Sequence, residues 1–227
     1  MDHKLFCDIL NSEMELATGC TEPAAVALCA AYARERLKGE IASLSVAASV
    51  NIIKNAMAAG IPGIQGTGIH YAAALGATGG KTQRRLQVID EASQEERRQA
   101  VALVEGGHVR MSRKETPEKL YVEVELHSDS GHQSKAVISG SHTNLTYLEE
   151  DGVCVLERSP QAAKEGGISP DVIDATLSIQ AIYDFVNELD REKDDLHMIE
   201  QAISVNRRIA QEGAKKPADI RDALRRA

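Results

Sequence analysis

The chain has 227 residues, of which 43% are hydrophobic and 26% charged, enough apolar content for one large folded domain or two small ones. A net charge of -8, with 3% aromatic residues and no Lys/Arg-rich run, argues against a nucleic-acid-binding surface. No apolar run reaches the roughly 18 residues of a membrane span, and the N-terminal residues lack the pattern of a secretory signal. We therefore expect a cytoplasmic protein with a small-molecule partner.

The first half of the chain is predicted to be mainly helical, because its apolar residues recur at helical spacing. A strand is expected over residues 41–50, and a glycine-rich loop over 60–68. The pattern Ser93-Gln94-Glu95-Glu96 predicts a capping box at a helix start. Helices are expected over residues 2–15, 21–37, 51–59, 70–77 and 93–105.

The second half begins with short strands separated by Asp-Ser-Gly and Asp-Gly turns, which is typical of an antiparallel meander. A connector rich in Pro and Gly precedes helices over 169–188, over 192–212 and after Pro217. We predict an α+β fold, with Ala-rich helices packed on the meander and a helical C-terminal tail. The expected domains are residues 1–158 and 159–227. The predicted strands of the meander are 109–112, 120–127, 134–139, 145–149 and 153–157.

Cys20 is the cysteine best placed for chemistry. It stands at the predicted start of the second helix, where the helix dipole and unpaired backbone N–H groups stabilise the thiolate that a nucleophile or metal ligand requires. A buried structural thiol explains the same residue, since unpaired cysteines are commonly interior. The other three lack close metal-ligand spacings and are expected to be reduced core residues. They are Cys7, Cys29 and Cys154.

Asn51, Lys54 and Asn55 bring a cation and two amides to a strand-to-helix junction ahead of the glycine-rich loop. Such groups can bind the carboxylate of an amino acid, although capping and an exposed lysine explain them as well. A lone lysine near glycines is weak evidence for a pyridoxal phosphate Schiff base. The loop lacks the Lys-Ser/Thr ending of a P-loop, so nucleotide binding is not expected.

A polar turn, Ser141-His142-Thr143-Asn144, interrupts the predicted strands. His142 can move protons near neutral pH, but a turn between strands accounts for the same residues. His127 and His132 flank another turn and could form a metal pair. No third ligand is evident for them, so we leave both outside the site.

Four sequence blocks, in this order, resemble the iron–sulfur L-cysteine desulfidase family, which is related to the serine dehydratase α-chain. The resemblance covers nearly the whole chain and weakens after about Gly213. The blocks are Gly19-Cys20-Thr21-Glu22-Pro23, then Asn51-Ile52-Ile53-Lys54-Asn55-Ala56-Met57 with Gly60-Ile61-Pro62-Gly63, then Ala72-Ala73-Ala74-Leu75-Gly76-Ala77, and Ser141-His142-Thr143-Asn144.

The resemblance implies an α,β-elimination that converts L-cysteine, or L-serine, to pyruvate, ammonia and hydrogen sulfide or water. It implies a [4Fe–4S] cluster with Cys20 as one ligand, whose open iron acts as a Lewis acid on the leaving group. Within the matching blocks we assign catalytic roles to His142, in proton transfer, and to Lys54, which could also hold the substrate carboxylate. The residues assigned to substrate binding are Asn51, Asn55, Thr21 and Glu22. These individual roles are hypotheses.

The chain also departs from the family pattern. Val50 stands where glycine is expected, and residues 64–71 differ from the usual glycine loop. Family chains continue beyond Gly213 into a segment with the other cluster cysteines, so the resemblance identifies this chain as a truncated N-terminal portion. A separate C-terminal segment or a homo-oligomer is the expected partner. The alternatives are an inactive remnant or amino-acid-binding module, and a thiol enzyme that uses Cys20 and His142 without a cluster.

Overall fold

A computed structural model describes residues 2–160 and 168–215 of the chain. It divides into two compact units, a larger one from residues 16–162 and a smaller one from residues 1–15 and 163–227. We expected the first helix to lie in a domain of residues 1–158. The structure instead groups this helix with the C-terminal helices.

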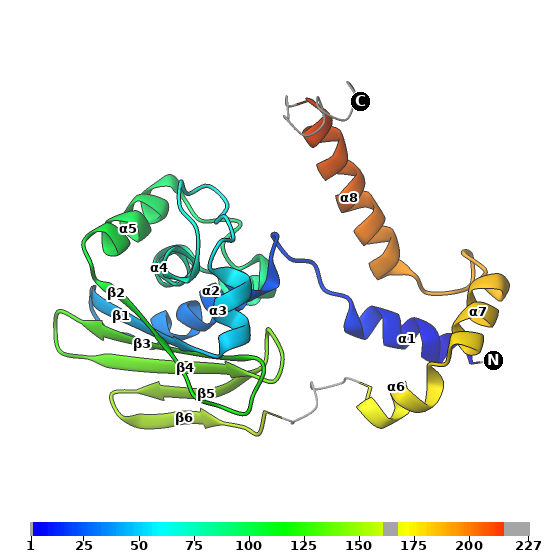
Figure 1. Cartoon of the computed structure of the whole chain (residues 1–227), viewed down its shortest axis with the longest axis horizontal. Helices are drawn as coiled ribbons and strands as arrows, with labels where there is room; N and C mark the ends of the chain where they lie inside the picture. Colours follow the sequence, from blue (N-terminus) through cyan, green and yellow to red (C-terminus); the bar gives the residue numbers. More distant parts are fainter. Residues whose placement is uncertain (1, 161–167, 216–227) are drawn as a thin grey trace. The chain divides into compact units, whose positions relative to one another are not determined.

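The larger unit contains a six-stranded mixed sheet with the order β2-β1-β3-β4-β5-β6 (Figure 1). The last four strands form the predicted antiparallel meander, and β1 pairs antiparallel with β3. The prediction was wrong for β2, which pairs in parallel with β1 at the edge of the sheet. A parallel pair needs a long crossover connection, and the helices between β1 and β2 provide it. The strands are β1 (Ile41–Ala48), β2 (Val109–Arg113), β3 (Tyr121–Ser128), β4 (Gln133–Ser139), β5 (Leu145–Glu150) and β6 (Val153–Glu157).

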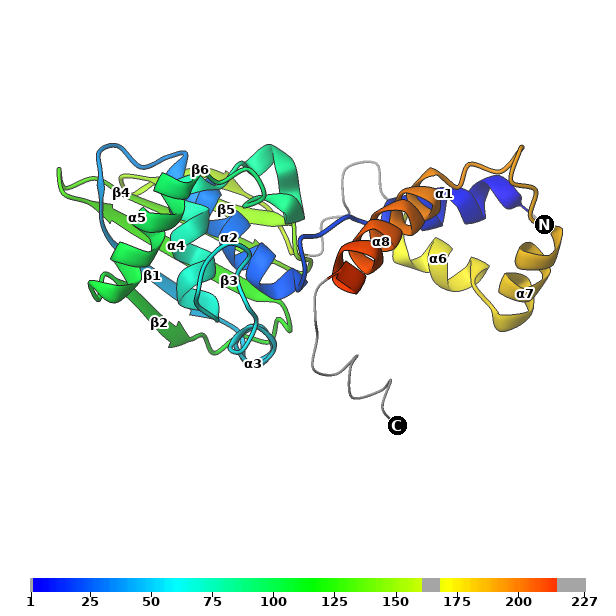
Figure 2. The ribbon, with the colours of Figure 1, turned by 90° about the horizontal axis from the view of Figure 1, so that it is seen from above.

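Two Ala-rich helices, α2 (Thr21–Arg34) and α4 (Ile69–Gly79), pack against one face of this sheet (Figures 1 and 2). Most residues of α2 are buried, as expected for a helix that is apolar on all sides. The two helices approach closely at Gly76, where an added Cβ would lie 2.1 Å from the backbone oxygen of Ala27. This contact explains why small residues dominate both helices.

Three further elements complete the larger unit. They are α3 (Val50–Ala56), the 3-10 helix η1 (Thr82–Gln87), which we did not predict, and α5 (Gln94–Glu105). The predicted capping box is confirmed at α5. The Ser93 backbone N–H donates to Glu96 Oε2 at 2.6 Å, and the Glu96 N–H donates to Ser93 Oγ at 3.2 Å.

The described part of the smaller unit is helical. It contains α1 (His3–Glu13), α6 (Pro170–Thr176), α7 (Ile179–Glu188) and α8 (His197–Lys215). We expected one helix over 169–188, and this was wrong. The helix breaks at Leu177, and the Ser178 side chain caps α7 by accepting the Ala181 N–H at 3.1 Å. The helix expected after Pro217 lies outside the described residues.

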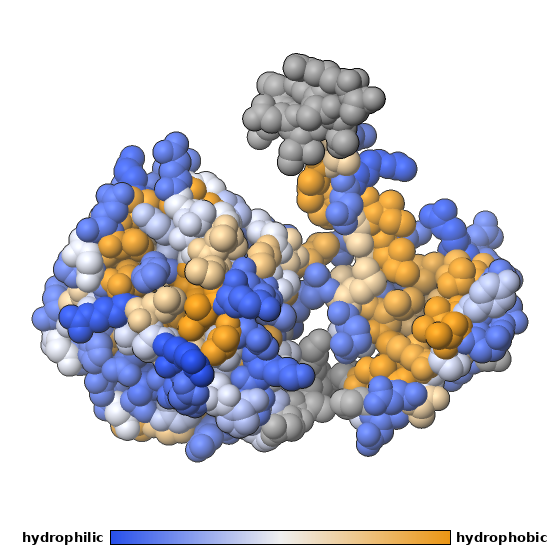
Figure 3. All heavy atoms as spheres, viewed as in Figure 1, coloured by the Kyte–Doolittle hydropathy of each residue, from blue (hydrophilic) through white to orange (hydrophobic). Residues whose placement is uncertain are grey.

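A small core holds the smaller unit together. Phe6 stacks on Phe185 with ring centroids 4.8 Å apart, beside the buried Cys7 and Leu196. Several apolar side chains of α7 and α8 remain exposed, and they contribute to the hydrophobic surface of these helices in Figure 3.

None of the described helices is both long and apolar enough to cross a membrane. Helices combined with this sheet confirm the α+β class.

Candidate functional site

The Gly-Cys-Thr-Glu-Pro motif begins α2. Gly19 has φ +102°, a left-handed conformation that favours glycine, and turns the chain into the helix. We expected Thr21 as the cap, but Cys20 occupies the cap position and Thr21 is the first helical residue. The Cys20 side chain makes no capping hydrogen bond and is exposed. The thiol therefore lies at a helix start, as predicted, and it is accessible, which the sequence had left open.

The Glu22 carboxylate is the centre of a cluster of hydrogen bonds. The Cys20 thiol donates to Glu22 Oε2 at 2.9 Å, and the Thr21 hydroxyl donates to the same oxygen at 3.3 Å. The other oxygen, Oε1, accepts from Asn55 Nδ2 of α3 at 2.8 Å. This last bond joins two sequence blocks that lie 33 positions apart. Four of the predicted site residues are thus in direct contact.

These contacts determine the protonation states in the cluster. Partial burial alone would raise the pKa of Glu22, but hydrogen bonds from Cys20, Asn55 and the backbone outweigh it, and the electrostatic contribution of His142 acts in the same direction. The resulting pKa of Glu22 is about 2, so the carboxylate is ionised at neutral pH. Although the Cys20 residue is exposed, partial desolvation of its sulfur raises the pKa of the thiol, and the bond to Glu22 raises it further. We expected a stabilised thiolate, which would lower the pKa of Cys20, but in the structure this pKa is raised.

Helix α3 presents polar residues to this cluster. Asn51, Lys54 and Asn55 are spaced i, i+3 and i+4, so they share one helix face, while Ile52 and Ala56 are buried on another. Asn51 and Lys54 are exposed, and neither side chain has a hydrogen bond or ion pair within the described structure. The Lys54 cation, which precedes the Glu22 partner Asn55 in the sequence, therefore remains available to an anionic group.

His142 lies in the turn between β4 and β5 and is partly buried. The turn is fixed by Asn144, whose Nδ2 donates to the Ser139 carbonyl at 2.9 Å, and by Arg85, which donates to the Thr143 hydroxyl at 2.7 Å. His142 contributes electrostatically to the lowered pKa of Glu22, so the fourth sequence block lies within electrostatic range of the first. The structure shows no direct hydrogen bond between these two side chains.

Sequence reasoning missed two anchors of the site. Thr18, just before the motif, donates its hydroxyl to Asp90 and its backbone N–H to the Leu86 carbonyl at 3.4 Å. Arg85 adopts φ 51° at the irregular point of η1, where it reaches the turn that carries His142. No short-range pattern could reveal them, because their partners are more than 50 positions away.

The remaining cysteines do not join Cys20. Cys7 and Cys29 are buried as predicted, and burial raises the pKa of the Cys29 thiol. Cys154 was expected in the core, but it is exposed on the edge strand β6. Within the described ranges, no three His, Cys, Asp or Glu side chains are grouped to hold a metal ion. These residues offer one thiol to an iron–sulfur cluster and do not fit a complete cluster site.

The two histidines that we left outside the site lie apart from it. His127 contacts Glu125 at 2.9 Å, and His132 contacts Asp151 at 2.9 Å. Each ring therefore has its own carboxylate partner, which gives these residues a structural explanation on the surface of the sheet.

Comparison with known proteins gives relatives along almost the whole chain. A UPF0597 protein of Clostridium perfringens is 34% identical over 212 residues, 93% of this chain and 48% of the relative. A UPF0597 protein of Desulfatibacillum aliphaticivorans is 36% identical over 92% of this chain and 48% of its own length. A UPF0597 protein of Clostridioides difficile is 33% identical over 94% of this chain and 50% of its own length. The chain therefore spans about half the length of these relatives. No protein-family model matches it.

Proposed function

We propose that this chain is part of an iron–sulfur lyase that eliminates hydrogen sulfide from L-cysteine or water from L-serine. The observation that carries the proposal is the cluster around Glu22, where hydrogen bonds from Cys20 and Asn55 lower the pKa of the carboxylate and His142 contributes in the same direction. These residues come from three separate blocks of the resemblance. Such a gathering of ionisable groups with a perturbed pKa favours a functional site.

The residues suit a zwitterionic substrate. Glu22 stays ionised and can pair with an ammonium group, while Lys54 and Asn51 on the neighbouring helix face can bind the α-carboxylate. Thr21 and Asn55 add hydrogen bonds close to the same carboxylate. Opposite charges on adjacent elements would thus orient the Cα–H bond of the substrate within the site.

In this proposal the neutral imidazole of His142 removes the α-proton, and the imidazolium that forms returns a proton to the sulfide or hydroxide that leaves from Cβ. The aminoacrylate that forms becomes an imine, and one water molecule hydrolyses the imine to pyruvate and ammonia. We assign Cys20 as one ligand of a [4Fe–4S] cluster, with the other ligands coming from a further segment or partner subunit.

We also place the protein in the cytoplasm, where its four cysteines would stay reduced.

An amino-acid-binding module is the second candidate function. The ionised Glu22 and the unpaired Lys54 fit a zwitterion whether or not a reaction follows. A thiol enzyme is less well supported, because burial and the bond to Glu22 keep the Cys20 thiol protonated.

The test is anaerobic reconstitution of the chain with iron and sulfide. The chain is prepared alone and co-expressed with the part of the Clostridium perfringens relative that it does not match. Cluster absorbance and pyruvate release from L-cysteine and L-serine are measured. We expect both signals in the co-expressed sample, and both should be lost in Cys20→Ala. Cys154→Ala is the matched control, because Cys154 is also exposed but lies on β6.

Other outcomes discriminate between the candidates. Saturable L-cysteine binding without pyruvate in any preparation would favour the binding module over the lyase. Turnover without iron that depends on Cys20 would favour the thiol enzyme. Loss of the cluster in both cysteine variants, or in neither, would contradict the assignment of Cys20.

A further inference from the structure

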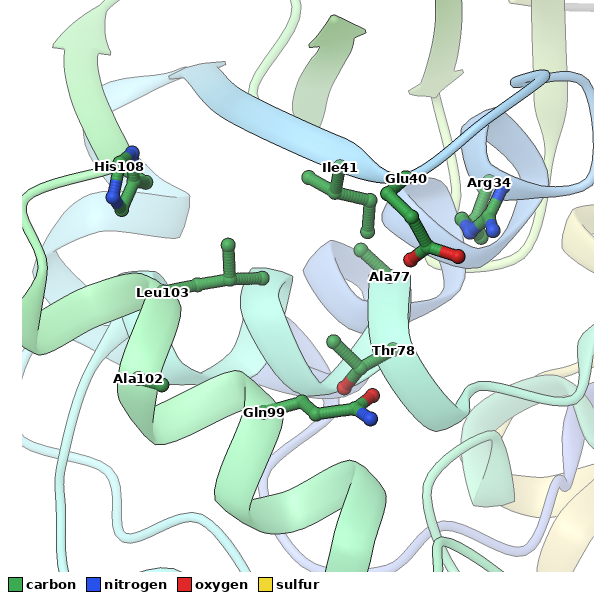
Figure 4. A pocket seen from close by; sticks show the side chains of 9 residues that line it. All are labelled: Arg34, Glu40, Ile41, Ala77, Thr78, Gln99, Ala102, Leu103 and His108. Carbon is green, nitrogen blue, oxygen red and sulfur yellow. The ribbon is translucent and has the colours of Figure 1, made fainter. Parts of the chain in front are cut away.

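A pocket of about 460 Å³ lies at the end of α2 that is remote from Cys20 (Figure 4). Its walls come from the C-terminal ends of α2 and α4, the start of β1, and α5. The 14 residues of α2 separate its two ends by about 20 Å, so this pocket is distinct from the candidate site. Its volume lies within the range of small-molecule sites, roughly 300–1,000 Å³.

The pocket carries one side chain of each charge, Arg34 and Glu40. Glu40 and Arg34 lie toward one end of it in Figure 4. Arg34 donates one guanidinium N–H to the Leu37 carbonyl at 2.8 Å, which leaves its other donors available. Within the described structure, neither charged group belongs to an ion pair, and the Glu40 carboxylate accepts no hydrogen bond. A ligand with both charges could therefore satisfy both side chains.

The remaining lining combines polar side chains, Thr78, Gln99 and His108, with an aliphatic part that can contact an apolar ligand body. Ile41, Ala77 and Leu103 supply aliphatic surface, and Ile41 and Leu103 pack against the main core behind them. Helix α4 ends beside Ala77 and Thr78, so the negative end of its dipole points to this region. A cation near Glu40 would be stabilised by the carboxylate and by the helix end together.

We propose that this pocket binds a small zwitterion, namely an α-amino acid with an apolar side chain. Arg34 binds the carboxylate, Glu40 binds the ammonium group, and the side chain lies against Ile41 and Leu103. The site is independent of the cluster around Glu22, so it gives the protein a second amino-acid site and does not rest on the lyase proposal.

The test is calorimetric titration of the full chain with L-leucine and with its two single-charge analogues, isoamylamine and isocaproate. L-Leucine should bind saturably, and each analogue should bind about tenfold or more weakly, because each lacks one charge-assisted contact. Glu40→Gln should weaken leucine binding by a similar factor. Glu105→Gln should not, since Glu105 is an exposed carboxylate of α5 that does not line the pocket.

Two further variants keep the result interpretable. Ala102→Phe places a ring in the pocket from an exposed position of α5 and should abolish leucine binding, with circular dichroism confirming that the chain is folded. Glu22→Gln should leave leucine binding intact. Absent leucine binding, equal affinity for the analogues, or binding that survives Glu40→Gln would overturn the proposal. Loss in Glu22→Gln alone would instead place the amino acid at the candidate site.

Discussion

Replacing Glu22 with glutamine tests whether its carboxylate organises the candidate site. The pKa of Glu22 falls from 4.5 to about 2 in the folded chain, because its hydrogen bonds outweigh the effect of burial. A group with a depressed pKa stabilises the fold at pH values above its unfolded pKa, and this stabilisation is lost as the pH falls through the folded pKa. Glu22 should therefore stabilise the larger unit at pH 5 and above.

The size of this effect follows from the shift. A change from 4.5 to about 2 corresponds to about 3 kcal/mol, and the partial exposure of the side chain lowers the expected value to roughly 2 kcal/mol. The wild-type chain should thus be about 2 kcal/mol more stable than Glu22→Gln at pH 7. This difference should shrink between pH 5 and pH 2, since protonation removes the advantage of the carboxylate.

Cys29 provides a reporter for the measurement, because it is fully buried in the larger unit and becomes reactive only when that unit opens. Urea unfolding is followed by circular dichroism at several pH values, and at pH 7 also by labelling Cys29 with a methanethiosulfonate reagent and mass spectrometry. Glu105→Gln is the control, as it removes an exposed carboxylate outside the cluster. Parallel pH dependences for wild type and Glu22→Gln would refute the inferred role of Glu22.

Three further substitutions test the packing of the two units. Gly76→Ala should destabilise the larger unit by about 3 kcal/mol or more, because the new methyl group would meet the backbone of α2. Gly213→Ala should stabilise α8 or leave its stability unchanged, because a Cβ at this position would have nothing within 4 Å. Urea unfolding measures both effects. Phe185→Ala should cost about 3–4 kcal/mol and expose Cys7 to labelling while Cys29 stays protected. Equal stability of the two glycine variants, or coincident exposure of both thiols, would contradict these expectations.

Local interactions explain which parts of the fold could be predicted. The capping box of Ser93 and Glu96 and the helix start at the Gly19-Cys20 motif depend on residues within a few positions, so the sequence displays them directly. The parallel pairing of β2 depends on contacts between strands some 60 positions apart, and alternation along a strand does not specify its neighbour. The same limit applies to Cys154, because its strand pattern does not distinguish an edge strand from a central one.

The candidate site depends both on local sequence and on contacts between distant parts of the chain. The positions of Cys20 and Glu22 follow from their motif, but the lowered pKa of Glu22 depends also on Asn55 and His142, which only the fold brings near. For Cys20, the helix-start argument favours a thiolate, whereas burial and the carboxylate two positions later favour the thiol. The carboxylate accepts a hydrogen bond from the thiol, so loss of the proton would leave two negative charges side by side. A cation or metal that approaches this sulfur would reverse that balance, which is why the same motif is compatible with both a protonated resting thiol and a ligand.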